Sequence, residues 1–352
     1  MTGSVSASPF DHPFLSGLLG DEEVATCFSA PADIDAMVAF EIALAVAEAA
    51  EGLLPAEAGR AIGEALADFR PDMEHLRTGT ARDGVVVPAL VQQLRGAIGE
   101  PHGVHVHFGA TSQDVIDTSL AIRLTSAMVI IEKRINSLID ALDALEARDG
   151  ALQVMAHTRM QAALPVPAAR KIASWREPLR RGLDRVPHVP GLALWGAVGT
   201  REKFGDKGEA VARRVAAALG LQLSSGPLHS ERDGQARLAS WLSLVTGALG
   251  KMGQDIALMA QSEVGEVRLA SGGGSSAMPH KVNPVGAEVL VTLARFNATL
   301  VSGMHQALVH ENERSGAAWT LEWMLLPQMV LALAASLRTA KDLFESLSFA
   351  RP

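Results

Sequence analysis

The stretch SQDVIDTSLAIRLTSAMVIIEKRINSLIDALDALEARD, residues 112–149, contains neither glycine nor proline. Apolar residues recur along it at steps of three and four, and eight steps cover 29 residues, a mean of about 3.6, the α-helical period. They are Ile116, Leu120, Leu124, Ala127, Ile131, Ile135, Leu138, Leu142 and Leu145. The pattern predicts one helix of roughly 50 Å, at about 1.5 Å per residue, whose apolar stripe needs long partners.

Other segments supply those partners. Residues 234–265 and 284–312 are rich in Ala, Leu, Val and Met, and Pro284 suits the start of a helix. Shorter helices are predicted at residues 32–51 and 55–69.

No alternating strand pattern of any length is present. We therefore predict an all-α protein, with a small helical N-terminal domain at residues 1–108 and a long-helix bundle at residues 109–352.

The composition excludes several classes of protein. Of 352 residues, 48% are hydrophobic and 20% charged, and the net charge of −8 argues against a nucleic-acid partner. Cys27 is the single cysteine, so no intrachain disulfide or cysteine-based zinc site is expected. The N-terminus lacks a signal-peptide pattern, and no apolar run reaches about 18 residues. We predict a cytoplasmic protein without a membrane partner, metal or cofactor.

A glycine-rich loop, SGGGSSAMPHKVNP, occupies residues 271–284. Its three glycines permit unusual backbone conformations, and its prolines stiffen the second half of the loop, so the loop can carry polar groups over a ligand. Those groups are Ser275, Ser276, Lys281 and Asn283. A glycine-serine stretch alone would be typical of a linker. It is not a phosphate-binding P-loop, because Val282 rather than a hydroxyl residue comes after the lysine.

Three blocks of sequence resemble the fumarase/aspartase superfamily, the all-helical lyases that include fumarase, aspartase, argininosuccinate lyase and adenylosuccinate lyase. SSAMPHKVNP is similar to its signature loop, and HFGATSQDVIDT (107–118) and TRMQAALP (158–165) to its two other active-site regions. The resemblance implies a homotetramer in which each active site takes these regions from three subunits. It also implies a helical C-terminal domain, which we expect to be missing because the chain stops about 70 residues after the loop.

Family members remove a proton beside a carboxylate and pass through an aci-carboxylate intermediate. By this resemblance Ser275 is the catalytic serine that exchanges the proton. Lys281 and Asn283 match the residues that stabilise the aci-carboxylate. Ser276 is expected to contact the backbone or a substrate carboxylate.

The other two blocks supply further candidates. Thr111 and Ser112 match a carboxylate-binding pair, and they could equally cap the long helix, whose N-terminus is itself an anion site. His107 matches the histidine of the family's HxGxTS pattern, as a catalytic or a structural residue. Gln161 matches a glutamine that hydrogen-bonds substrate, with a surface amide as the alternative.

One departure from the family pattern is informative. Where adenylosuccinate and argininosuccinate lyases carry THxQ, with the histidine as acid for a leaving nitrogen, this chain has Arg159. Arginine stays protonated, so Arg159 cannot shuttle a proton, but it can bind a carboxylate through two parallel hydrogen bonds. The upstream histidine pair of those lyases is also missing from residues 81–88, ARDGVVVP. We predict a leaving group that needs no acid.

A carboxylate is such a group, since its reference pKa is about 4. One superfamily branch adds a carboxylate across a double bond, lactonizing 3-carboxy-cis,cis-muconate in bacterial protocatechuate breakdown. The chain is similar to that branch in GATSQDVIDT and in ENERSGAAWTLEW (311–323). Such a tricarboxylate substrate would meet Arg159, Lys281 and Arg314, although Arg314 could instead cap the preceding helix.

Three other functions stay open at this point. A sulfonated muconate would suit the same arginines. An adenylosuccinate- or argininosuccinate-type lyase is disfavoured by Arg159. A non-catalytic helical scaffold is disfavoured by Ser275, Lys281 and Asn283 with their glycine hinge, because a scaffold gains nothing from a mobile loop.

Overall fold

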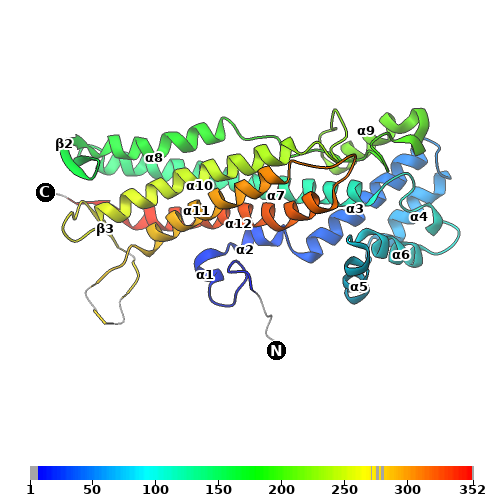
Figure 1. Ribbon diagram of the computed structural model, residues 1–352, viewed down its shortest axis with the longest axis horizontal. Helices are drawn as coiled ribbons and strands as arrows, with labels where there is room; N and C mark the ends of the chain where they lie inside the picture. The colour runs from blue at the N-terminus through cyan, green and yellow to red at the C-terminus, as the bar shows by residue number, and fades with distance from the viewer. Residues whose placement is uncertain (1–6, 271, 275–276, 279–280, 351–352) are drawn as a thin grey trace.

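The structure, a computed structural model, describes residues 7–270, 272–274, 277–278 and 281–350. Helices dominate it, and the predicted all-α fold class is confirmed (Figure 1). The α-helices are α1 (Ser16–Leu19), α2 (Glu22–Thr26), α3 (Ala30–Ala50), α4 (Ala56–Leu66), α5 (Met73–Asp83), α6 (Val87–Ile98), α7 (Ser112–Asp149), α8 (Ala168–Leu183), α9 (Gly208–Leu219), α10 (Asp233–Met259), α11 (Val285–Gln306) and α12 (Gly316–Ser346). The strands are β1 (Gln153–Thr158), β2 (Gln161–Pro167), β3 (Val267–Leu269) and β4 (Leu347–Phe349).

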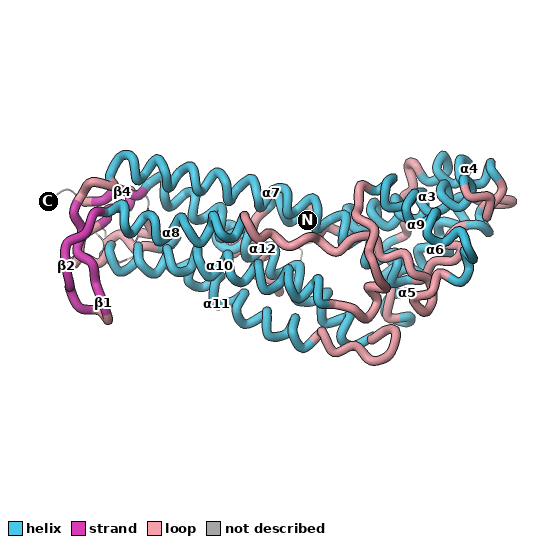
Figure 2. The backbone as a smooth tube through the Cα atoms, turned by 90° about the horizontal axis from the view of Figure 1, so that it is seen from above, coloured by secondary structure: helices cyan, strands magenta, loops and turns pink. Residues whose placement is uncertain are grey.

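A bundle of α7, α8, α10, α11 and α12 forms the long axis of the molecule (Figures 1 and 2). The predicted long helix is α7, with 38 residues. Eight of the nine predicted stripe residues are buried, and Ile116 is partly buried. The two segments predicted as its partners form α10 and α11, which approach each other so closely that a Cβ at Gly253 would collide with the carbonyl oxygen of Ala287. The helices that pack mainly against α7 itself are α3, α8 and α12. The periodic apolar pattern therefore predicted these helices of the bundle, but not which helices contact α7.

A second, smaller hydrophobic cluster lies at one end of the bundle. It contains buried residues of α3, α4, α6 and α9, together with Leu192, Leu194 and Phe204 from the segment before α9. The start of α7 contributes Val115. The cluster thus crosses residue 108, and the division into domains at that residue remains a prediction.

The expectation of no strands was wrong. β1 and β2 form an antiparallel hairpin, and β3 pairs with β4. The hairpin turn consists of Arg159 and Met160, with φ of 49° and 66°, so both adopt the left-handed conformation of a type I′ turn. Such turns usually contain Asn or Gly, and neither residue is present to signal the turn here. The side chains of β2 are almost all exposed, so this strand has no buried face and its sequence does not alternate between apolar and polar residues.

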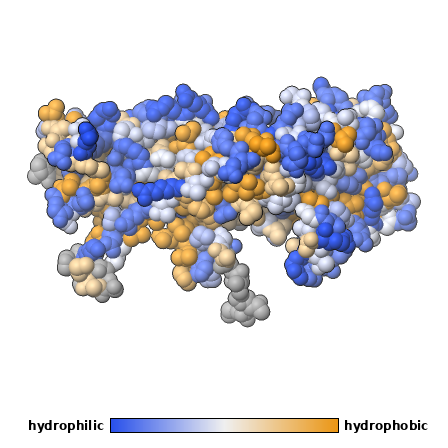
Figure 3. Space-filling model, in the orientation of Figure 1, coloured by the Kyte–Doolittle hydropathy of each residue, from blue (hydrophilic) through white to orange (hydrophobic). Residues whose placement is uncertain are grey.

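Two bundle helices are strongly apolar. By length and composition α11 and α12 could cross a membrane, with mean hydropathies of 1.2 and 1.4. Core helices of soluble bundles pass the same test, and most of the α12 window is buried inside the molecule. Hydrophobic surface remains exposed along the flank of the bundle (Figure 3). Leu244 of α10 and Met324 of α12 are examples.

Candidate active site

The first predicted block forms the N-terminus of α7. Thr111 is the N-cap, in a capping-box arrangement with Asp114, whose Oδ2 accepts from the Thr111 amide at 3.0 Å. Asp114 is fully buried, and its carboxylate also accepts from the amides of Trp195 and Gly196 and pairs with His229 Nε2 at 2.8 Å. The capping alternative for Thr111 is therefore seen. It is compatible with anion binding, because Thr111 and Ser112 are only partly buried at a helix N-terminus.

Arg314 lies at this same helix end, although 201 residues separate it from Gln113. Its Nε donates to Gln113 Oε1 at 2.9 Å, and its Nη2 donates to the Ala197 carbonyl at 3.1 Å. Neither acceptor belongs to the preceding helix, so these contacts do not support the alternative of a cap on α11. The buried Gln113 is held in turn by donation from Nε2 to the His229 carbonyl at 2.9 Å.

His107 joins this group from the segment before α7. Its Nδ1 lies 2.6 Å from Oε1 of Glu41 on α3, and its backbone is left-handed, with φ of 67°. Glu41 was not predicted from the sequence. A signal existed, because Glu41 falls on the apolar face of α3 at helical spacing from Ile34, Met37 and Leu44.

A buried ionic network underlies this end of the molecule. Arg232 donates to Asp117 of α7 at 2.6 Å and forms two hydrogen bonds to Glu322 of α12, and all three side chains are nearly inaccessible. Trp319 Nε1 donates to the other Asp117 oxygen at 2.9 Å. Burial alone lowers the pKa of Arg232, but the two carboxylates outweigh it and raise that pKa. The network fixes α7 against α12, and its members carry no local sequence signal.

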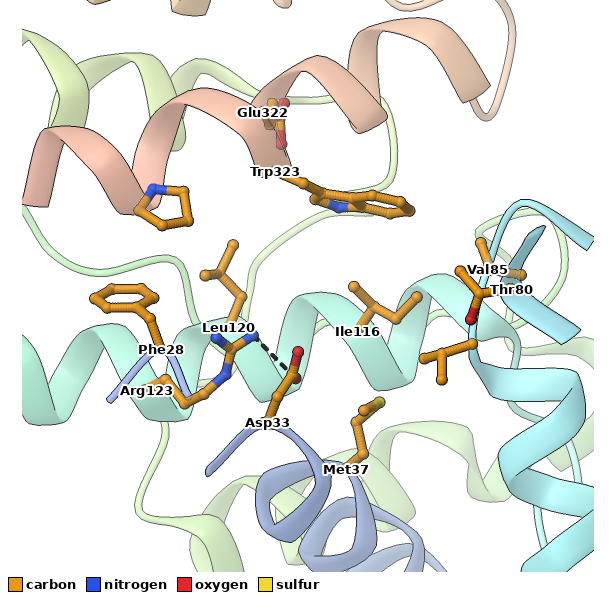
Figure 4. Close-up of a pocket in the computed structure, with 12 residues that line it drawn as sticks. Phe28, Asp33, Met37, Thr80, Val85, Ile116, Leu120, Arg123, Glu322 and Trp323 are labelled. Atoms are coloured by element: carbon orange, nitrogen blue, oxygen red, sulfur yellow. Dashed lines mark ion pairs between the residues drawn. The ribbon is translucent and has the colours of Figure 1, made fainter. Parts of the chain in front are cut away.

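A pocket of about 450 Å³ opens beside the network (Figure 4). Ile116, Leu120 and Arg123 of α7 form one wall, and Trp323 of α12 lies opposite. Arg123 is paired with Asp33 at 3.0 Å. The last turn of α5 contributes Thr80, and the turn between α5 and α6, in the middle of the sequence ARDGVVVP (81–88), contributes Val85 and Val86. The wall at this turn is consequently mostly apolar.

The second predicted block lies at the opposite end of the bundle. Arg159 and Gln161, at the hairpin turn, are both exposed. A pocket of about 490 Å³ beside the hairpin is lined by Arg159, His157, Lys171 and Glu266 among others. Arg159 is thus available to a ligand or to another chain.

The signature loop begins at that same end. Lys281 is exposed, and Asn283 pairs through its backbone with Gly273, with amide-to-carbonyl distances of 2.8 and 2.9 Å. Ser275 and Ser276 lie outside the described residues. Glu266 joins the hairpin to the root of the loop, because it directly precedes β3 and its Oε1 accepts from the Met155 amide at 2.7 Å.

Within the described part of one chain, the predicted site residues do not come together. His107, Thr111, Ser112 and Arg314 gather at the N-terminus of α7, and the hairpin comes after its C-terminus (Figure 1). At about 1.5 Å per residue, the 38 residues of α7 span roughly 57 Å. No side chain bridges such a distance, so each end by itself is only part of the predicted site.

Comparison with known proteins decides the family. A family model described as lyase matches residues 22–298. The chain belongs to the fumarase/aspartase lyase superfamily. It is 38% identical to 3-carboxy-cis,cis-muconate cycloisomerase of Pseudomonas putida, over 91% of this chain and 78% of that protein. It is 35% identical to the protein of that name from Bradyrhizobium diazoefficiens, over 95% of this chain and 76% of the relative.

A solved structure agrees. The crystal structure of the 3-carboxy-cis,cis-muconate lactonizing enzyme from Pseudomonas putida matches with a TM-score of 0.89 at 35% identity. The match covers 96% of this chain and 77% of that one. The prediction of an enzyme in this lyase superfamily is confirmed, against the alternative of a non-catalytic scaffold.

Proposed function

We propose that this enzyme lactonizes 3-carboxy-cis,cis-muconate, as a cycloisomerase of protocatechuate (β-ketoadipate) breakdown. The observation that carries the proposal is Arg159, which is exposed at the hairpin turn. At this position the amine-releasing lyases of the family have a histidine that acts as general acid. An arginine there can bind a carboxylate but cannot protonate a leaving nitrogen. The names of the similar proteins support the same reaction.

The reaction needs neither an oxidant nor a cofactor. One substrate carboxylate oxygen forms a bond to a ring-closing carbon, and the double-bond electrons move to give an aci-carboxylate. A proton is then delivered to the carbon beside that carboxylate. Ser275 is the proposed proton-exchanging residue, and Lys281 and Asn283 stabilise the negative charge of the intermediate.

Three carboxylates require three anchors. The N-terminus of α7, with Thr111 and Ser112, is suited to one because its amides and dipole favour an anion. Arg314 is held beside that terminus by Gln113 and provides a second charge. Arg159 provides the bidentate partner for a third, with Gln161 and Ser276 as further hydrogen-bonding groups.

The site is proposed to be completed by assembly into a cytoplasmic homotetramer. One end of a subunit would supply the α7 terminus, and neighbouring subunits would supply the hairpin and the signature loop. The separation of the two ends by the length of α7 supports this arrangement. So do the side chains of Met160 and Leu164 on the hairpin, which are 74% and 70% exposed in one chain.

The test is ultraviolet loss of the conjugated diene of 3-carboxy-cis,cis-muconate. Parallel reactions contain cis,cis-muconate, a sulfonated muconate or adenylosuccinate. Rapid loss with the carboxylated diene, abolished in Ser275→Ala and kept in the surface control Ser126→Ala, is the expected result. Preference for the sulfonated diene would reassign the substrate, and turnover of adenylosuccinate alone would refute the inference from Arg159.

A further inference from the structure

Glu41 and His107 form a pair that links α3 to the segment before α7. The Glu41 carboxylate is 1% exposed and the His107 ring 17%. Glu41 Oε1 lies 2.6 Å from Nδ1, so the ring nitrogen on the other side, Nε2, is left for a ligand. Among the described residues Nε2 has no hydrogen-bond partner in the structure.

The backbone around His107 is held in an unusual shape. His107 has φ of 67°, and Gly109 has φ of 68° with the Phe204 ring where a Cβ would lie. A left-handed conformation costs a residue other than glycine about 1–3 kcal/mol. His107 lies two residues before Gly109 and four before Thr111, the N-cap of α7. Its backbone keeps this costly conformation, and the contact with Glu41 orients the imidazole ring there.

Glu41 is also costly to bury. Its Oε2 is buried with no partner among the described residues. Glu48, two turns further along α3 and also 1% exposed, has no described partner for either oxygen. Burial, with repulsion from Glu41, raises the pKa of Glu48 to about 9, so Glu48 is neutral at pH 7. A buried ion pair often stabilises a core no better than apolar side chains of similar volume would, so the pairing of Glu41 with His107 points to another role.

The charges around His107 favour its protonated form. Burial lowers its pKa, and Arg95 of α6 acts in the same direction. The charge and hydrogen bond of Glu41, with the charge of Asp114 on α7, outweigh both and raise the pKa. The imidazolium is therefore populated below the raised pKa and is lost as the pH rises through it.

We propose that Glu41 is a positioning residue, which holds His107 by Nδ1 as a cation whose Nε2–H donates to a substrate carboxylate. The proposal rests on the proposed function, since it takes His107 to face substrate. It makes His107 an anion anchor that keeps its proton. The proton exchange is left to the signature loop.

Calorimetric titration of the full-length protein with propane-1,2,3-tricarboxylate tests the pair without turnover. Wild type is expected to bind with proton uptake near neutral pH and to lose affinity as the pH rises. Glu41→Gln keeps the shape of the side chain but removes its charge. The loss of affinity should therefore occur at lower pH than in wild type, and Kd at pH 7.5 should rise roughly tenfold. The matched control Glu48→Gln, on the same helix, should bind as wild type does.

Two outcomes would overturn the proposal. One is an unchanged pH dependence of binding in Glu41→Gln, with only its Tm altered, which would make the pair purely structural. The other is proton uptake in His107→Gln that equals that of wild type, which would show that His107 does not take up the proton. This variant also tests the proposal if Glu41→Gln does not fold. Turnover of the muconate is measured separately, so pH-linked binding without turnover would refute the proposed reaction and leave the role of Glu41 standing.

Discussion

Arg314 and Gln113 are joined by a hydrogen bond of 2.9 Å, which brings the segment before α12 to the first turn of α7. Ser112 directly precedes Gln113 in the sequence, so the guanidinium of Arg314 is held beside the helix N-terminus, which itself favours an anion. The position of Arg314 is therefore set by a buried amide on the helix that carries the predicted carboxylate-binding pair.

Replacement of Arg314 by lysine should weaken substrate binding more than it slows chemistry. Lysine keeps the charge but cannot reach Gln113 and Ala197 together in the fork geometry of arginine. We expect KM to rise about tenfold with little change in kcat or Tm. Steady-state kinetics of Arg314→Lys beside the exposed control Arg237→Lys measure this, and an unchanged KM would remove Arg314 from the substrate site.

Removal of Arg232 should destabilise the fold strongly. Arg232→Met leaves Asp117 and Glu322 buried without their cation, which costs about 3–5 kcal/mol. Arg237→Met removes an exposed pair with Asp233 on α10 and should cost less than about 0.5 kcal/mol. Denaturant unfolding monitored by circular dichroism compares the two, and equal losses would contradict the role assigned to burial.

Glu48 should make the protein less stable as the pH rises. Its pKa is about 9 in the folded chain against an ordinary value of 4.5, so the folded state retains a proton that the unfolded state releases between these values. Stability is consequently lost as the pH rises from 4.5 towards 9. Glu48→Gln should be more stable than wild type at pH 8, by on the order of a few kcal/mol, and equal to it near pH 4.5. Melting curves at the two pH values check this, and a gain of the same size at both would exclude the titration of Glu48.

Arg159→His should not convert the enzyme into an amine-releasing lyase. The histidine restores the THxQ pattern, but the upstream segment still lacks its histidine pair. We expect lactonization to fall at least roughly tenfold, through the lost bidentate contact, and adenylosuccinate to remain unreacted. Assays of both substrates, with the exposed α8 variant Arg170→His as control, provide the measurement. Gain of adenylosuccinate cleavage would show that residue 159 alone selects the reaction.

Features that depend on local sequence were predictable. The apolar period of α7 and the start of α11 after Pro284 both appear in the structure. The hairpin was missed because Arg159 and Met160 adopt left-handed conformations without the usual Asn or Gly. A strand also needs an alternating face, which the exposed β2 does not have.

Long-range partnerships were not predictable from one sequence. Glu41 meets His107 across 66 residues, and Arg232 meets Glu322 across 90. These contacts depend on how whole helices pack, and only the charged residues on the apolar face of α3 hinted at one of them. The motifs predicted the site residues, and the structure was needed to show that those it describes lie at two ends of the bundle.

The proposed sharing of the active site between subunits is tested most directly by mixing two inactive variants. Arg314→Ala is defective at the α7 end, and Lys281→Ala is defective in the signature loop. After joint unfolding and reassembly, random mixing should give about a quarter of the sites both intact ends, and lactonization should reappear to that extent. If the mixture stays inactive while a mixture of either variant with wild type assembles and reacts, the two ends do not form a site between chains, and the proposed shared site is contradicted.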